Sequence, residues 1–163
     1  MGAGKSAVAR ALGEKLLAPV ADLDARIAAR SGCSIVDVFA RDGEPAFRER
    51  ETEELGGALD DGSGVLACGG GIVLSETNRA LLGRRCRTVW LDVEVEEAAR
   101  RVEPARATRP LVQGGTLAGR LDQLLRERWR LYAAVAIARI DTTGRTIEDV
   151  AELVLATLEI PCA

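Results

Sequence analysis

Residues 2–6 read Gly-Ala-Gly-Lys-Ser, and this stretch decides which fold the chain is expected to adopt. Apolar residues follow at spacings of three and four from Val8 to Leu16, so a helix is predicted to begin directly after the glycines. Backbone N–H groups at such a helix start attract an anion, Lys5 would reach the β and γ phosphates of a nucleotide, and the Ser6 hydroxyl would bind Mg²⁺. Because a bare Gly-Lys-Ser occurs often by chance, a capped surface helix is the alternative.

The phosphate-binding pattern is incomplete at its start. The full motif has another glycine five positions before Gly4 and a strand before that glycine, and both fall before Met1. Such a strand is normally central, so its absence would leave two neighbouring strands with unpaired edges. We therefore expect the native protein to begin upstream with an apolar strand, Met1 being an internal methionine. The alternative is a shortened gene whose fold compensates with a partner or a gap.

The composition excludes several classes of function. The 163 residues suffice for a single domain, 1–163, and a net charge of −3 without a separate basic run argues against a nucleic-acid partner. No histidine is present, which excludes Ser-His-Asp and Cys-His catalysis, and the four cysteines form no CxxC pair that would suggest zinc. The sequence contains no apolar stretch of the roughly 18 residues that a membrane helix needs and no secretory region at its N-terminus. We expect a cytoplasmic protein without a membrane partner.

Short apolar runs alternate with helical patterns along the chain. Residues 19–21, 65–68, 88–91 and 136–140 are predicted to form strands, and those at 65–68 and 88–91 are expected to be buried. Strands that alternate with helices predict an α/β fold with a parallel sheet flanked by helices. Residues 103–115 lack periodicity and contain two prolines, so they are predicted to form a loop.

Capping residues mark the expected helix boundaries. Ser34 with Asp37, and Thr146 with Asp149, have the three-residue spacing of a capping box, in which two side chains bond the backbone N–H groups at a helix start. Gly43 is expected to end the helix that follows Ser34.

Three further features suggest ligand chemistry. Asp22 and Asp24 are expected on the same side of an extended segment, suited to Mg²⁺ or to orienting a hydroxyl; alternatively, they cap the next helix. Glycines 69–71 would let a ligand approach the backbone closely, unless they form only a flexible turn. Arg109, beside Pro110 in the predicted loop, is a candidate phosphate clamp, whereas most other arginines are expected on solvated faces.

The order and spacing of six segments resemble the shikimate kinase family over essentially the whole chain. The segments are GAGKS at 2–6, DLD at 22–24, DGEPAFRERE at 42–51, GGG at 69–71, TRPLV at 108–112 and RLY at 130–132. The resemblance implies a P-loop kinase fold, with a central parallel β-sheet flanked by helices and a mobile lid at about 103–115. It also implies transfer of the γ-phosphate of ATP to the 3-hydroxyl of shikimate, on the route to chorismate and aromatic amino acids.

The resemblance implies roles for the residues on the ATP side. Ser6 and Asp22 would hold Mg²⁺, and Arg145 would lie along the adenine. The family often has an arginine that stacks on the adenine at the start of the lid. The corresponding position in this sequence falls near Arg101 and Val102, and neither residue is assigned to this role. The residues implied to bind ATP are Gly2, Ala3, Gly4, Lys5, Ser6, Ala7, Arg109 and Arg145. The residues implied to be catalytic are Lys5, Asp24 and Arg109.

On the acceptor side, the resemblance implies a binding site for a small carboxylate. Arg48 and Arg128 would hold the shikimate carboxylate through planar guanidinium groups. Asp24 would orient or deprotonate the attacking hydroxyl, while Gly70 and Gly71 would offer backbone N–H groups to the ring. ATP and shikimate are therefore the expected partners, and the chain is expected to act as a monomer.

Two other functions fit the same features. The first is another small-molecule P-loop kinase, similar to gluconate or nucleotide kinases, although a nucleotide acceptor calls for stacking aromatics and this chain has only five. The second is an inactive truncated relative that binds a ligand or partner without turnover. The presence of Lys5, Asp24 and Arg109 argues against that second function.

Overall fold

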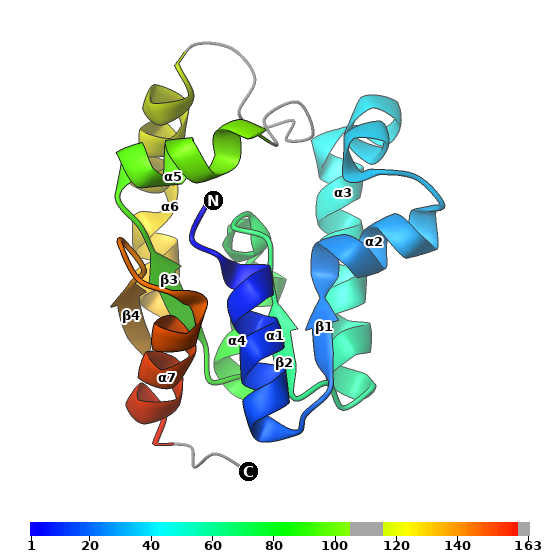
Figure 1. Ribbon diagram of the computed structural model, residues 1–163. Helices are drawn as coiled ribbons and strands as arrows, with labels where there is room; N and C mark the ends of the chain where they lie inside the picture. The colour runs from blue at the N-terminus through cyan, green and yellow to red at the C-terminus, as the bar shows by residue number, and fades with distance from the viewer. Residues whose placement is uncertain (105–115, 160–163) are drawn as a thin grey trace.

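Four short strands alternate with helices in the residues that the computed structural model describes, 1–104 and 116–159 (Figure 1). In chain order the elements are α1 (Lys5–Leu16), β1 (Val20–Asp22), α2 (Leu23–Ser31), α3 (Ile35–Asp60), β2 (Val65–Ala67), the 3₁₀ turn η1 (Ile72–Leu74), α4 (Glu76–Arg85), β3 (Val89–Asp92), α5 (Val95–Val102), α6 (Leu117–Val135), β4 (Ala138–Asp141) and α7 (Ile147–Thr157).

The strands form two parallel pairs. β1 pairs with β2, with Val20 opposite Val65, and β3 pairs with β4, with Val89 opposite Ala138. This confirms the predicted α/β class with parallel strands flanked by helices. Within the described residues, however, the pairs do not join into one sheet, and β2 and β3 both line a cavity that lies between them.

Helices cover both faces of the strands with separate apolar cores. On one face, α1 and α7 pack on side chains from the strands, with Val150, Ala151 and Val154 almost fully buried. On the other face, α3, α4 and α6 enclose a second core around Leu23 and Leu55, neither of which is exposed to solvent. The strands are therefore apolar on both sides, as expected for parallel strands covered by helices.

Two predicted strands are less buried than expected. Val65 and Leu66 in β2, and all four residues of β3, are only partly buried. The prediction that both strands are buried is wrong for these residues, because the cavity exposes the edges that face it.

The predicted helix caps are confirmed. Capping boxes begin α3 at Ser34 and α7 at Thr146. Gly43 has φ 78° and ψ 172° and breaks α3 into two helical parts, with Pro45 in the first turn of the second part. A positive φ of this size suits glycine, which has no Cβ. The helix end that was predicted at Gly43 is therefore present as a kink within α3.

The predicted loop at 103–115 falls mostly on positions 105–115, outside the described residues, and Arg106, Arg109 and Cys162 lie outside them as well. Across the described part of the chain, no helix combines the length and the apolar character that a membrane crossing requires.

We predict that Thr146→Ala lowers the free energy of unfolding by about 1 kcal/mol, because the Thr146 side chain accepts the Asp149 backbone N–H at the start of α7. Urea unfolding followed by circular dichroism measures the change. Thr157→Ala, at the exposed other end of the same helix, is the matched control and is expected to change stability by less than about 0.5 kcal/mol. Equal losses in the two variants would contradict the capping role.

Candidate active site

The glycine-rich loop places a helix start at the carboxyl ends of the strands. Gly4 is the N-cap of α1 with φ 78°, and its carbonyl accepts the backbone N–H groups of Ala7 and Val8. Gly2 has φ 77°, and a Cβ there would lie 2.9 Å from the Ala98 Cα atom in α5. Both glycines are therefore required by geometry, one for its backbone conformation and one also for its close approach to α5.

Ser6 and Asp22 bring two oxygen donors together beside this loop. The Ser6 hydroxyl donates a short hydrogen bond to Asp22 Oδ2. Asp22 Oδ1 accepts the Ala25 backbone N–H at 3.3 Å, so the same carboxylate also caps α2. Hydroxyl and carboxylate oxygens suit Mg²⁺, which takes one or two protein ligands beside phosphate oxygens and water. The residues present therefore fit the metal that the sequence suggested.

The two aspartates do not share an extended segment. Asp22 ends β1, but Asp24 already lies in the first turn of α2. The prediction that period-two spacing puts both carboxylates on the same side is wrong, because the Asp22 cap starts the helix between them. Asp24 instead approaches the glycine triplet: a Cβ on Gly69 would lie 3.2 Å from Asp24 Oδ1 and 3.0 Å from Glu51 Oε1.

A buried carboxylate, Glu51, holds the predicted acceptor arginine. Its residue surface is 1% exposed, and it accepts a short hydrogen bond from Arg48 Nη1, three residues earlier in α3. Arg48 also donates through Nη2 to Glu44 Oε1 at 2.7 Å and lies over the Phe47 ring. Burial opposes the charged guanidinium, but Glu51 and Glu44 outweigh it and raise the pKa of Arg48. Burial raises the pKa of Glu51, while Arg48 opposes that shift.

The second predicted arginine reaches the same place from α6. Arg128 is 7% exposed, and its Nε atom is buried without a hydrogen-bond partner in the described part of the chain. Tyr132, one turn later in α6, donates its hydroxyl to the Gly70 carbonyl at 2.6 Å. Burial raises the pKa of Tyr132, so the phenol stays protonated and keeps this bond near neutral pH.

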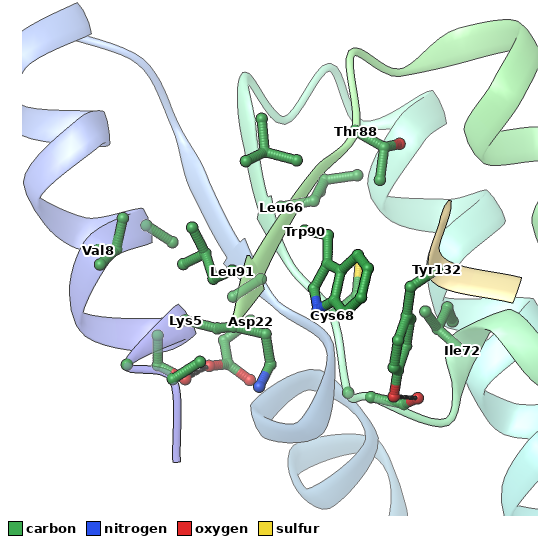
Figure 2. Close-up of a pocket in the computed structure, with 18 of the residues that line it drawn as sticks. Lys5, Val8, Asp22, Leu66, Cys68, Ile72, Thr88, Trp90, Leu91 and Tyr132 are labelled. Atoms are coloured by element: carbon green, nitrogen blue, oxygen red, sulfur yellow. Dashed lines mark hydrogen bonds between the residues drawn. The ribbon is translucent and has the colours of Figure 1, made fainter. Parts of the chain in front are cut away.

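One cavity of about 1000 Å³ connects the loop with the acceptor residues. In Figure 2, Lys5 and Asp22 lie at the same end of this space, while Trp90 and Tyr132 stand side by side on the other flank of β3. Their ring centroids are 5.4 Å apart. The predicted site residues that line the cavity are Gly2, Ala3, Gly4, Lys5, Ser6, Ala7, Asp22, Asp24, Arg48, Gly70, Gly71 and Arg128.

Arg145 is the described site residue that lies elsewhere. Its Nε atom donates to the Asp141 carbonyl at 3.0 Å, and it does not line the cavity. Arg101 does line the cavity, and it donates to the Gly2 carbonyl at 3.3 Å and to the Thr142 carbonyl at 3.0 Å. Arg101 thereby ties the phosphate loop to the loop after β4.

Sequence reasoning gave no role to Glu51 or Tyr132, although each ends a segment that carries the family resemblance and each has a local signal. Glu51 follows Arg48 by three residues and Tyr132 follows Arg128 by four, which are the spacings of neighbours on one helix face. The spacing alone does not show that these pairs face the glycine triplet.

Loops of this kind, which open a helix at the carboxyl edge of parallel strands, bind phosphate in P-loop phosphotransferases, and the fold and site place this chain in that class. A family model described as shikimate kinase matches residues 1–159. The shikimate kinase of Thermobifida fusca is 44% identical over 162 residues, which cover 99% of this chain and 91% of the relative. That of Symbiobacterium thermophilum is 39% identical over 98% of this chain and 92% of the relative.

A solved structure is similar over nearly the whole chain as well. It is the shikimate kinase from Acinetobacter baumannii in complex with shikimate, with a TM-score of 0.93 and 35% identity, covering 98% of this chain and 88% of that chain. The chain belongs to the shikimate kinase family.

We predict that Gly71→Ala weakens shikimate binding about tenfold or more, because the added Cβ would overlap the Arg48 guanidinium, which packs against Gly71. Gly71 has φ −88°, so alanine is tolerated by the backbone and the effect comes from the displaced arginine. Isothermal titration with shikimate measures the affinity. Gly83→Ala, where a Cβ meets nothing within 4 Å, is the control and should leave affinity unchanged; unchanged affinity in Gly71→Ala too would contradict the packing.

Proposed function

We infer that this chain transfers the γ-phosphoryl group of ATP to the 3-hydroxyl of shikimate, a step in aromatic amino-acid biosynthesis. The observation that carries this inference is the convergence of Arg48 and Arg128 on a cavity that the phosphate-binding loop also lines. Two guanidinium groups suit a compact carboxylate, which each can bind through two parallel hydrogen bonds. Membership of the shikimate kinase family supports the same substrate.

We propose that the shikimate carboxylate completes the hydrogen bonding of both arginines. Arg128 Nε is buried without a partner among the described residues, and such a donor gains most from a charged acceptor. Arg48 is anchored on its inner side by Glu51, whereas its other partner, Glu44, has a side chain that is 44% exposed. The substrate carboxylate can therefore replace Glu44 without disturbing the buried ion pair.

We propose that the remaining residues position the two reacting groups. The N-terminus of α1 and Lys5 would hold the phosphates, since helix dipole and ammonium group both favour anions. Ser6 and Asp22 would hold Mg²⁺, which neutralises charge on the phosphates when bound. Asp24, which lies against Gly69 and lines the same cavity, would accept a hydrogen bond from the attacking hydroxyl and orient it.

Further proposals concern Arg109, Arg145, the location of the protein in the cell and its oligomeric state, and they are supported by side-chain chemistry and by the family. Arg109, outside the described residues, is proposed to neutralise charge on the transferring phosphoryl group, and Arg145 to contact the adenine. Cys33, Cys68 and Cys86 are unpaired, which suits the reducing cytoplasm. One chain supplies both the phosphate loop and the acceptor arginines of the cavity, so no second copy is needed to build the site, and we propose that the chain acts as a monomer.

A coupled assay that follows ADP release from ATP tests the function. We expect release with shikimate and Mg²⁺, and none above background with gluconate or AMP as acceptor. Preference for gluconate or AMP would instead indicate one of the related small-molecule kinases. Binding of both ATP and shikimate without ADP release would indicate an inactive relative.

We predict that Arg48→Ala raises the KM for shikimate by roughly tenfold to 150-fold, the effect of losing one charge-assisted contact worth about 1.5–3 kcal/mol. The KM for ATP should stay near normal, because Arg48 lies at the acceptor residues. Steady-state kinetics with each substrate varied provide the measurement. Arg41→Ala serves as the control, since Arg41 lies in the same helix, pairs with Asp42 and does not line the cavity. An unchanged shikimate KM in Arg48→Ala would remove the assignment.

We predict that Arg109→Ala lowers kcat far more than it weakens shikimate binding, because the charge that it would neutralise develops in the transition state. Arg109→Lys should restore little, since an ammonium group does not reproduce the planar fork. Arg106→Ala, three residues earlier, is the control. A kcat near that of the parent chain in Arg109→Ala would show that another residue has this role.

A further inference from the structure

One carbonyl of the glycine triplet at 69–71 is held by a side chain from another helix. The carbonyls of Gly69 and Gly71 accept backbone N–H groups of the adjoining turn η1 at 3.1 and 2.9 Å. The Gly70 carbonyl instead accepts the hydroxyl of Tyr132, 62 residues away in α6, at 2.6 Å. The orientation of the peptide between Gly70 and Gly71 therefore depends on a contact that the turn itself does not supply.

This contact also determines where the Gly71 N–H points. A peptide unit is planar and trans, so its C=O and N–H groups point in opposite directions. The N–H of Gly71 belongs to the same peptide as the Gly70 carbonyl, and glycine on both sides leaves that peptide an unusually wide choice of orientations. Gly71 lines the cavity, and a Cβ there would overlap the Arg48 guanidinium. The Gly71 backbone thus lies beside the group that is proposed to bind the acceptor carboxylate.

The Tyr132 side chain is fixed by its surroundings. Its ring stands beside Trp90, with centroids 5.4 Å apart, and packs on the core that contains Ile72 and Leu82 (Figure 2). Burial raises the pKa of Tyr132, and the charge of Arg128, one turn earlier in α6, opposes that rise. The phenol therefore stays a hydrogen-bond donor near neutral pH, at a place close to the second acceptor arginine.

We propose that Tyr132 is a positioning residue for the acceptor: its hydroxyl orients the peptide between Gly70 and Gly71 so that the Gly71 N–H donates to an oxygen atom of the bound acceptor. Tyr132 acts through this peptide and not on the transferring phosphoryl group. The role rests on the proposed function, because the acceptor must occupy the part of the cavity beside Arg48 and the glycine triplet. It is separate from the carboxylate contacts of the two arginines.

Tyr132→Phe removes the hydroxyl and keeps the ring. We expect the Kd and the KM for shikimate to rise about threefold to tenfold, the range for one neutral hydrogen bond. The kcat should stay within about twofold and the KM for ATP should not change, because a contact that is equally strong in ground state and transition state affects the acceptor KM alone. Trp129→Phe is the matched control, since Trp129 lies in the same helix, is exposed and does not line the cavity.

A double-mutant cycle tests whether the hydroxyl acts through the glycine triplet. A Cβ on Gly70 would lie 3.0 Å from the Tyr132 hydroxyl oxygen and, among the described residues beyond its chain neighbours, would meet no other atom within 4 Å. The φ of Gly70 lies outside the left-handed region, so the backbone accepts alanine. Gly70→Ala should weaken shikimate binding about threefold to tenfold in the parent chain, but by less than about twofold in the Tyr132→Phe background, where the oxygen is absent.

Isothermal titration with shikimate, together with urea unfolding of each variant, distinguishes the outcomes. A parent chain that does not bind shikimate would overturn the proposed function, and the role of Tyr132 with it. If the parent chain binds shikimate, unchanged affinity in Tyr132→Phe or in Gly70→Ala would overturn the positioning role alone. Additive losses in the cycle would overturn it as well, because the hydroxyl would then act elsewhere than on Gly70. Equal losses for ATP and shikimate, accompanied by lower stability, would indicate a general structural role and would overturn it too.

Discussion

The parallel orientation of the strands is the constraint on which the candidate site depends. Because β1, β2 and β3 run in the same direction, the residues that follow their carboxyl ends meet at one edge. Asp22 ends β1, Gly69 follows β2, and α5 with Arg101 follows β3. The phosphate-binding loop lies at the same edge, so separate parts of the sequence contribute to one cavity.

At the acceptor end, a buried ion pair determines where the charges lie. A buried carboxylate such as Glu51 is costly unless it is paired and hydrogen-bonded, and Arg48 supplies both forms of compensation. Arg48 is therefore held by the fold before any ligand binds, which lowers the entropy lost on binding. The glycine at position 71 is part of this arrangement, since only a residue without Cβ leaves room for the guanidinium group.

The two strand pairs are held together by helices rather than by a continuous ladder. α1 packs against α7 on one face and contacts β2 as well, so this helix spans the space between the pairs. On the opposite face, Trp90 of β3 contacts Tyr132 of α6, whose hydroxyl bonds the glycine triplet after β2. These helix contacts hold the phosphate loop and the acceptor residues in a defined relative position, although β2 and β3 are not hydrogen-bonded to each other.

The sequence by itself determined the features that depend on residues a few positions apart. The capping boxes at Ser34 and Thr146, the kink at Gly43 and the helix start after Gly4 all follow from local backbone chemistry. The alternation of strands and helices determined the fold class for the same reason. Resemblance in segment order added the residues of both halves of the site, most of which the structure brings to one cavity.

Only the tertiary structure decided which distant groups meet. Tyr132 bonds a carbonyl 62 residues away, and Glu51 interacts with both Arg48 and Asp24, which come from different helices. The start of α2 at Leu23 moved Asp24 out of the extended segment, because the capping bond of Asp22 competes successfully with strand geometry. Arg145 lies away from the cavity, and the edges of β2 and β3 are half-exposed. Such outcomes depend on packing between elements, and periodicity along one element carries no information about its neighbours.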